Sequence, residues 1–290
     1  MNSGQEPVRA VPFSLPEPGP EIELNTLRGI FRRGGRREFL TPQRLAFDML
    51  YRLDAGETIH QVDFTPHHLG PGDMLWLRAG QVHRWGEIGD LEGSVVMFPS
   101  HLTDPHAREM SIRPDAHRKS SWSSVELVRS GVAAAWEALF APESEAMGAA
   151  LRGHLRHAGL SAVLLRLGSA SDDEPTNPAD AHDEIFGWFL AEVEARFRTT
   201  HRVSEYARRL GYSPKTLTRA ASIRGTTPKR VIDDRIILEA QRLLVFTARS
   251  VADLGAEMGF EDASNFSSFF RQRTGMTPKH FRELADVRER

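Results

Sequence analysis

The stretch from Ser250 to Phe281, SVADLGAEMGFEDASNFSSFFRQRTGMTPKHF, has the pattern of a helix, a tight turn, a second helix and a stop. Ser250 is a good helix N-cap, because its hydroxyl can accept a hydrogen bond from an unpaired N–H of the first turn. Gly259 and Gly275 supply the permissive backbone that ends each helix. The pattern predicts a helix-turn-helix unit, whose second helix can enter the DNA major groove. For a single unit, an ordinary helical hairpin is the alternative.

The second helix of this stretch has two faces of different character. Phe266, Phe269 and Phe270 are predicted to point into a core. The opposite face carries small polar and cationic side chains, as a DNA-reading helix requires. These residues are Ser264, Ser267, Ser268 and Arg271.

The same design occurs a second time, between Val203 and Val231, as VSEYARRLGYSPKTLTRAASIRGTTPKRV. Corresponding residues are offset by 48 positions at Gly211/Gly259 and by 50 at Pro228/Pro278. Such a slowly drifting offset indicates a duplicated structural unit. Ser213 and Pro214 predict the start of its second helix. The outward-facing residues of that helix are Lys215, Thr218, Arg219 and Ser222.

The residues between the two copies, KRVIDDRIILEAQRLLVFT, have the apolar spacing of one long helix. This helix would carry one helix-turn-helix unit at each end. The first unit is predicted at residues 203–224 and the second at residues 251–273.

Together these features resemble the AraC/XylS family of transcription regulators, from about Ile185 to the C-terminus. The resemblance rests on the duplicated units, on the linking sequence RIILEAQRLL that begins at Arg235, and on the pattern G-F-x-D-x-S-x-F…F-x-x-x-x-G-x-T-P from Gly259 to Pro278. Ser268 stands where the family usually has Arg. The resemblance implies sequence-specific binding of double-stranded DNA by both second helices.

The cationic residues of the two helices have different expected roles. Arg219 is the best candidate for a base contact, because Arg pairs bidentately with guanine. Lys215, Arg271 and Arg273 are expected to contact phosphates, which position the protein without specifying a sequence.

The charge of the chain is divided between its two ends. Residues 195–290 hold 19 Lys and Arg against 11 Asp and Glu, whereas the preceding residues hold 18 against 28. A basic C-terminal region on an acidic body favours phosphate contact by one domain only.

Length and composition set further limits. A chain of 290 residues predicts two domains. The absence of cysteine excludes disulfides, thiolate metal sites and a cysteine nucleophile. No apolar run approaches the roughly 18 residues of a membrane span, and no secretory signal pattern opens the chain. We therefore expect a cytoplasmic protein that does not enter a membrane.

Residues 21 to about 100 alternate short apolar runs with turn residues, which predicts a small antiparallel barrel or sandwich. The segment GDMLWLRAGQVH, Gly72–His83, resembles the second sequence motif of the cupin jelly roll, with Arg78 where that motif usually has Pro. The resemblance implies a ligand pocket inside the barrel. Its candidate effector-binding residues are His60, Trp76, His83 and Trp85, each of which has a purely structural core or rim position as the alternative.

We expect neither a metal nor a cofactor. A complete metal shell needs three or four converging ligands, and His60 and His83 are the available candidates. His154 and His157 are expected on a solvated face. No P-loop, G-x-S-x-G or H-E-x-x-H motif occurs, so no catalytic residue is assigned and the chain is not expected to be an enzyme.

The predicted protein is α+β, with an N-terminal antiparallel cupin-like β barrel and helices, and an all-α C-terminal domain. Residues 125–140 suit one helix and later residues one or two more. The predicted segments are a flexible arm at 1–20, the sensing domain at 21–120, a helical extension at 121–168, a linker at 169–181 and the DNA-binding domain at 182–290.

The function that follows is a transcription regulator controlled by a small-molecule effector. The helical extension covers the barrel or forms a homodimer interface, and RNA polymerase is a further candidate partner. Two alternatives stay open. One is a metal-dependent cupin enzyme fused to a DNA-binding domain, and the other is a regulator that needs no ligand.

Overall fold

The computed structural model describes residues 9–13, 21–35, 39, 41–102, 119–144, 147–170 and 181–288. The chain divides into an N-terminal unit, residues 8–176, and a C-terminal unit that contains residues 177–290. Most of the predicted arm and most of the predicted linker lie outside the described residues, and the predicted domain boundaries stay predictions.

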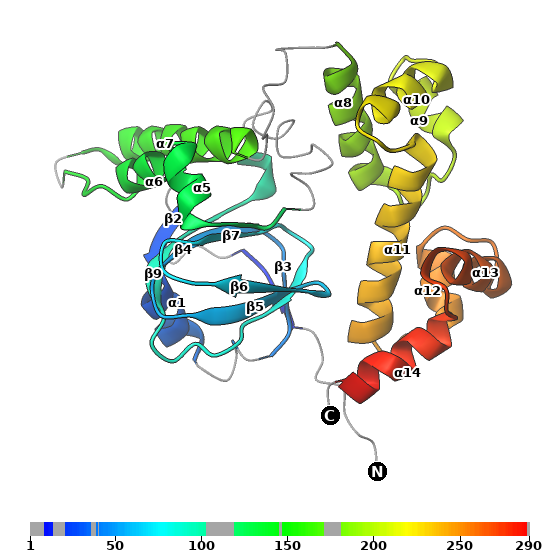
Figure 1. The fold of residues 1–290 in the computed structure, drawn as a ribbon, viewed down its shortest axis with the longest axis horizontal. Helices are drawn as coiled ribbons and strands as arrows, with labels where there is room; N and C mark the ends of the chain where they lie inside the picture. Colours follow the sequence, from blue (N-terminus) through cyan, green and yellow to red (C-terminus); the bar gives the residue numbers. More distant parts are fainter. Residues whose placement is uncertain are drawn as a thin grey trace. The chain divides into compact units, whose positions relative to one another are not determined.

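Two five-stranded sheets form the centre of the N-terminal unit (Figure 1). In spatial order, the first sheet contains β1 (Arg9–Val11), β3 (Gln43–Leu45), β8 (Val82–Arg84), β5 (Thr58–Val62) and β6 (Thr65–Leu69). The second contains β10 (Ser121–Trp122), β7 (Met74–Leu77), β4 (Asp48–Ala55), β9 (Glu92–Phe98) and β2 (Glu23–Thr26). All pairs are antiparallel except β1 with β3, a parallel pair that lies partly in the predicted arm.

These sheets are separate and do not close into one barrel, so the cupin jelly roll stays a prediction. Alternate residues of the second sheet enter two different cores, because successive side chains of a strand point to opposite faces. Leu75 and Leu77 pack between the sheets, whereas Met74 and Trp76 pack on the other face. Strand β7 is therefore apolar at every position.

Helices cover the outer face of the second sheet. They are α5 (Ser124–Arg129), α6 (Val132–Leu139) and α7 (Ala149–Ser169), and their apolar residues share a core with that sheet (Figure 1). The indole N–H of Trp136 in α6 donates to the Ser94 hydroxyl of β9 at 2.7 Å. The helix predicted over residues 125–140 is interrupted at Gly131, whose φ of 73° lies in the left-handed region. The described residues of the unit also form α1 (Leu27–Gly34) and the 3-10 turn Ser100–Leu102.

Every secondary-structure element in the described part of the C-terminal unit is a helix. Its elements are α8 (Ala181–Arg196), α9 (Val203–Arg209), α10 (Pro214–Ile223), α11 (Pro228–Phe246), α12 (Val251–Glu257), α13 (Ala263–Thr274) and α14 (Pro278–Arg288). The long helix α11 runs unbroken for 19 residues. Figure 1 shows α9–α10 and α12–α13 at different levels along α11.

Local sequence signals define the helix ends of this unit. Ser213 and Ser250 cap α10 and α12 as predicted, since each hydroxyl accepts from a backbone N–H of the first turn. Asp262 caps α13 in the same way, with 2.7 Å from its Oδ1 to the Asn265 nitrogen. Gly259 and Gly275 both have φ near 80°, a conformation that favours glycine.

One shared core joins the two helix-turn-helix units. Leu217, Ala220 and Ala221 of α10 are buried in it, and so are Phe266 and Phe270 of α13. The contributing residues of α11 are Ile232, Ile236, Ala240, Leu243 and Leu244. The inward positions predicted for Phe266 and Phe270 are confirmed, and Phe269 packs against the same core partly buried.

Candidate nucleic-acid interface

Helix α10 presents a polar, cationic face to solvent. Lys215, Thr218, Arg219 and Ser222 are all exposed. Thr218 and Ser222 donate to backbone oxygens of their own helix, at 2.9 and 2.8 Å, so their hydroxyl oxygens keep acceptor capacity. Within the described chain, no carboxylate is ion-paired with Lys215 or Arg219. Both cations are therefore available to an anionic partner.

Helix α13 presents a second such face. Ser264, Ser268 and Arg271 are exposed, and Ser267 is half-buried. Arg273 differs from these, because its guanidinium pairs with the Asp233 carboxylate of α11. Asp233 is buried and also accepts from the Lys229 ammonium at 2.6 Å. Arg273 thus ties the end of α13 to α11, a contact for which the sequence held no signal.

Three of the four predicted effector-binding residues lie together in the N-terminal unit. His60, His83 and Trp85 are buried between the sheets, and Tyr51 joins them. The Tyr51 hydroxyl lies 2.9 Å from His60 Nδ1, and His60 Nε2 lies 3.0 Å from His83 Nδ1. The rings of His60 and Trp85 have centroids 4.3 Å apart. We call these four residues the histidine cluster.

Two polar atoms of the histidine cluster lack a partner in the described chain. They are Nε2 of His83 and Nε1 of Trp85, and both are buried. A buried polar group without a hydrogen bond costs about 1–3 kcal/mol, so such atoms mark a place where a polar group of a ligand would be stabilising.

Trp76, the fourth predicted effector-binding residue, lies on the other face of its sheet. Its indole N–H donates to the Asp48 carboxylate at 2.9 Å, and the Arg78 guanidinium lies 4.4 Å from the centre of its ring. Burial raises the pKa of Asp48 and lowers the pKa of Arg78 to about 10. Trp76 therefore belongs to the layer between sheet and helices, apart from the histidine cluster.

The described residues contain no group of three His, Asp or Glu side chains that could hold a metal ion. His154 and His157 are exposed on α7. The histidine cluster offers two imidazoles, which is fewer ligands than a metal shell needs.

Burial makes both cluster imidazoles hard to protonate. It lowers the pKa of His83 to about 3 and lowers the pKa of His60 well below its ordinary value, with the neighbouring His83 as a second cause for His60. Both side chains are neutral at pH 7.

We expect the N-terminal unit to lose stability as the pH falls below about 6.5, the ordinary histidine pKa. Because both folded-state pKa values are lowered, the unfolded chain binds more protons in this range, and the stability present above pH 6.5 is lost on acidification. The loss approaches about 1.4 kcal/mol per pH unit for each histidine. Urea unfolding followed by tryptophan fluorescence between about pH 7.5 and 5 measures it, a window above the ordinary carboxylate pKa values.

Two variants control this measurement. His83→Asn keeps a group near the position of Nδ1 but cannot titrate, so it should remove the part of the pH dependence that comes from His83 and leave the part that comes from His60. His154→Asn removes an exposed imidazole and should leave the pH dependence unchanged. A slope that is the same in wild type and in His83→Asn would contradict the assignment.

Comparison with known proteins agrees with the two helix-turn-helix units. A family model described as a helix-turn-helix domain matches residues 206–284. The chain is 25% identical over 243 residues to the HTH-type transcriptional activator RhaR of Pectobacterium carotovorum, covering 82% of this chain and 84% of that protein. It is 30% identical over 95 residues to the HTH-type transcriptional regulator ExsA of Pseudomonas aeruginosa, covering 32% of this chain and 34% of that protein.

Solved structures give weaker similarities. ToxT from Vibrio cholerae O395 has 11% identity and a TM-score of 0.39, with 91% of this chain and 98% of that chain covered. A transcriptional regulator from Chromobacterium violaceum, of the AraC-type DNA-binding class, has 24% identity and a TM-score of 0.33, with 37% and 96% covered.

The two exposed helices and the sequence matches define the chain as a helix-turn-helix transcription regulator that binds DNA. No helix in the described part of the chain has the length and apolar character needed to cross a membrane.

Proposed function

We propose that the chain is an effector-controlled, sequence-specific transcriptional activator of the AraC/XylS type. The observation that carries this proposal is the pair of exposed polar and cationic faces on α10 and α13, held on one core within the matched helix-turn-helix domain. The relatives RhaR and ExsA, named as an activator and a regulator of transcription, support it.

The two helices would enter successive major grooves on one face of the duplex, about 34 Å apart. Arg219 would pair with a guanine, and Lys215 and Arg271 would contact phosphates. Arg273 would act mainly through Asp233, by holding α13 in place. The hydroxyl groups that complete the two faces are those of Thr218, Ser222, Ser264, Ser267 and Ser268.

In vitro selection from a random duplex library with the 290-residue chain tests this function. The enriched sequences should contain two short conserved blocks whose centres are about 10–10.5 base pairs apart. Enrichment of no sequence over the starting library would refute it.

The N-terminal unit would sense a small polar effector at the histidine cluster. The unpartnered Nε2 of His83 and Nε1 of Trp85 support this placement, because two nearby buried polar atoms can fix the orientation of one ligand. The apolar surroundings of the cluster would supply the remaining contact area. Trp76 would take no part in this site, since it lies on the opposite face of the sheet.

A ligand that binds at the histidine cluster should raise the melting temperature of the wild-type chain, because it stabilises the folded state alone. At a concentration of about 100 times its Kd, the stabilisation is about 2.7 kcal/mol. Thermal unfolding against a panel of sugars, sugar alcohols and short carboxylic acids measures the effect. The shift should vanish in His83→Asn and persist in His154→Asn. A hit whose shift survives in His83→Asn would place the effector elsewhere.

We also propose that the chain forms a homodimer through α5 and α7. Four large apolar side chains on these helices are exposed, namely Val125, Val128, Leu151 and Leu155. A second copy of the chain would cover them.

A cytoplasmic location and contact with RNA polymerase follow from the proposed activity as a transcription regulator and belong to the same proposal.

A further inference from the structure

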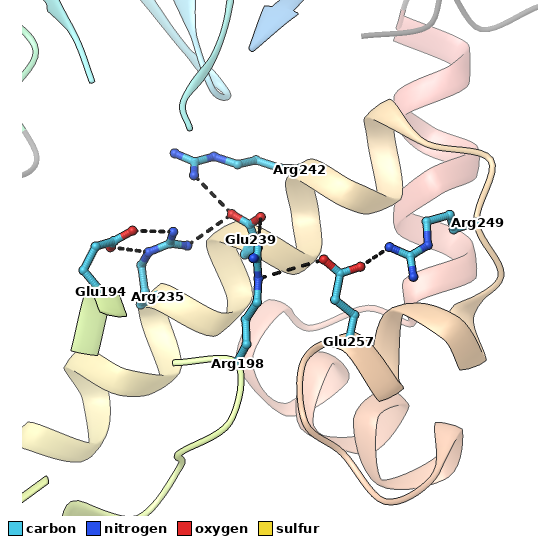
Figure 2. Close-up of polar contacts among 7 residues, drawn as sticks. All are labelled: Glu194, Arg198, Arg235, Glu239, Arg242, Arg249 and Glu257. Carbon is cyan, nitrogen blue, oxygen red and sulfur yellow. Dashed lines mark hydrogen bonds and ion pairs between the residues drawn. The ribbon is translucent and has the colours of Figure 1, made fainter. Parts of the chain in front are cut away.

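A buried carboxylate lies in the middle of α11. Glu239 is fully buried, and its oxygens contact three guanidinium groups, those of Arg198 at 2.6 Å, Arg235 at 3.3 Å and Arg242 at 3.3 Å (Figure 2). Burial alone lowers the pKa of Arg235, but Glu194 and Glu239 outweigh it and hold that pKa above its ordinary value. Charges at such a position are expensive to desolvate and persist only when well paired.

The ion pairs around Glu239 connect separate helices. Arg235 forms a bidentate pair with Glu194 near the end of α8, at 2.6 and 2.8 Å. Arg198, in the connection after α8, also lies 3.9 Å from the Glu257 carboxylate of α12. Glu257 pairs in turn with Arg249 in the connection between α11 and α12. Figure 2 shows Arg198 between the carboxylates of α11 and α12.

The backbone at Arg198 also contacts the turn between α12 and α13. A Cβ atom at Gly259, in the turn between α12 and α13, would lie 2.3 Å from the carbonyl oxygen of Arg198. The rings of His201 and Phe260 pack beside this contact, with centroids 4.9 Å apart. The segment that leads into the first helix-turn-helix unit therefore rests directly on the turn of the second.

We infer that Arg198 and Glu239 are positioning residues that fix the orientation of α10 relative to α13. Helix α8 packs against α10, and Arg198 leaves the end of α8 to reach both α11 and α12. Helix α11 is one connection between the two helix-turn-helix units. The ion pairs of Arg198 with Glu239 and Glu257, which we call the Arg198 bridge, form a second connection. If the proposed DNA-binding function holds, the bridge sets the one separation of half-sites that both helices can read together.

Distance measurements on the free protein test the positioning role without DNA. The chain has no cysteine, so Ser222→Cys on α10 and Ser268→Cys on α13 can carry the only two spin labels. A narrow distance distribution is expected for this pair, broadened or shifted by Arg198→Gln. Arg196→Gln is the matched control, because Arg196 and Arg198 have equally exposed side chains, 43%, and each pairs with a glutamate. An unchanged distribution in Arg198→Gln overturns the inference.

Spacing preference on DNA tests its consequence. In sites obtained by selection with wild type, one base pair inserted between the half-sites rotates one of them by about 35°. Wild type and Arg196→Gln should lose about tenfold or more in affinity, since one half-site is no longer read. Arg198→Gln should lose less than about threefold on the same insertion. Glu257→Gln, which breaks the pairs with Arg198 and Arg249 but leaves those of Glu239 intact, should also relax the preference.

The outcomes distinguish a failure of the positioning role from a failure of the proposed DNA-binding function. A uniform loss on every spacing, with the wild-type preference retained, would show a general stabilising role and overturn the inference. Failure of wild type to select any DNA would refute the proposed function, whereas the spin-label distances would still decide the positioning role.

Discussion

Replacing Phe266 with alanine is expected to lower the free energy of unfolding of the C-terminal unit by about 3–5 kcal/mol. Phe266 is fully buried in α13, with ring centroids 5.4 Å from Phe260 and 6.0 Å from Phe270. A Cβ atom built at Gly255 of α12 would lie 3.0 Å from the Cβ atom of Phe266, so α12 and α13 are in close contact there. Removing the ring leaves a cavity that such tight packing fills poorly.

This loss is large compared with the total stability of a domain, about 5–15 kcal/mol. Specific DNA binding should therefore weaken together with stability, because α13 loses its support. Urea unfolding followed by far-UV circular dichroism measures the change. Phe269→Ala is the control, since Phe269 is only partly buried and should cost clearly less. Equal losses in the two variants would contradict the packing described for α13.

Replacing Arg219 with alanine is expected to weaken binding to a selected DNA site by about 1–3 kcal/mol and to relax the preference at one base pair. The side chain is exposed, so the free energy of unfolding should change by less than about 0.5 kcal/mol. Fluorescence anisotropy with the selected duplex and with each substituted duplex measures the loss of affinity and the relaxed base preference.

Lys215→Ala provides the comparison for Arg219→Ala. A phosphate contact weakens binding by a similar factor on all sequences and reduces the salt slope by about 1. If Arg219→Ala lost equally on selected and random DNA, Arg219 would be a phosphate contact and not a base contact.

Much of the C-terminal unit could be predicted from local sequence. N-caps such as Ser213 and Ser250 act within one helical turn, and Gly259 and Gly275 act through their own φ angles. The apolar spacing of α11 likewise records its burial in a shared core. Signals of this kind need no knowledge of distant residues.

Ion pairs between helices could not be predicted in this way. Glu239 and Asp233 look like ordinary surface charges in a helical pattern, yet both are buried and hold arginines from other elements. Their burial depends on how α8, α12 and α13 pack on α11. Sequence position beside the recognition face predicts that Arg273 contacts DNA, but it carries no information about the pair that Arg273 forms with Asp233.

In the N-terminal unit, strand register decides which of the predicted effector-binding residues lie together. His60, His83 and Trp85 meet between the sheets, whereas Trp76 lies on the opposite face of its own strand. A shift of one residue would exchange the two faces, and motif resemblance alone does not fix that register. The pairing of β1 with β3 could not be predicted from the sequence either, because residues 9–11 have no periodic pattern of their own.

Hydroxyl-radical footprinting of the 290-residue chain on a selected duplex tests the central claim most directly. Two recognition helices held on one core should protect two short tracts on one face of the DNA, with centres about 10–10.5 base pairs apart. A single protected tract, or two tracts on opposite faces of the duplex, would contradict the account.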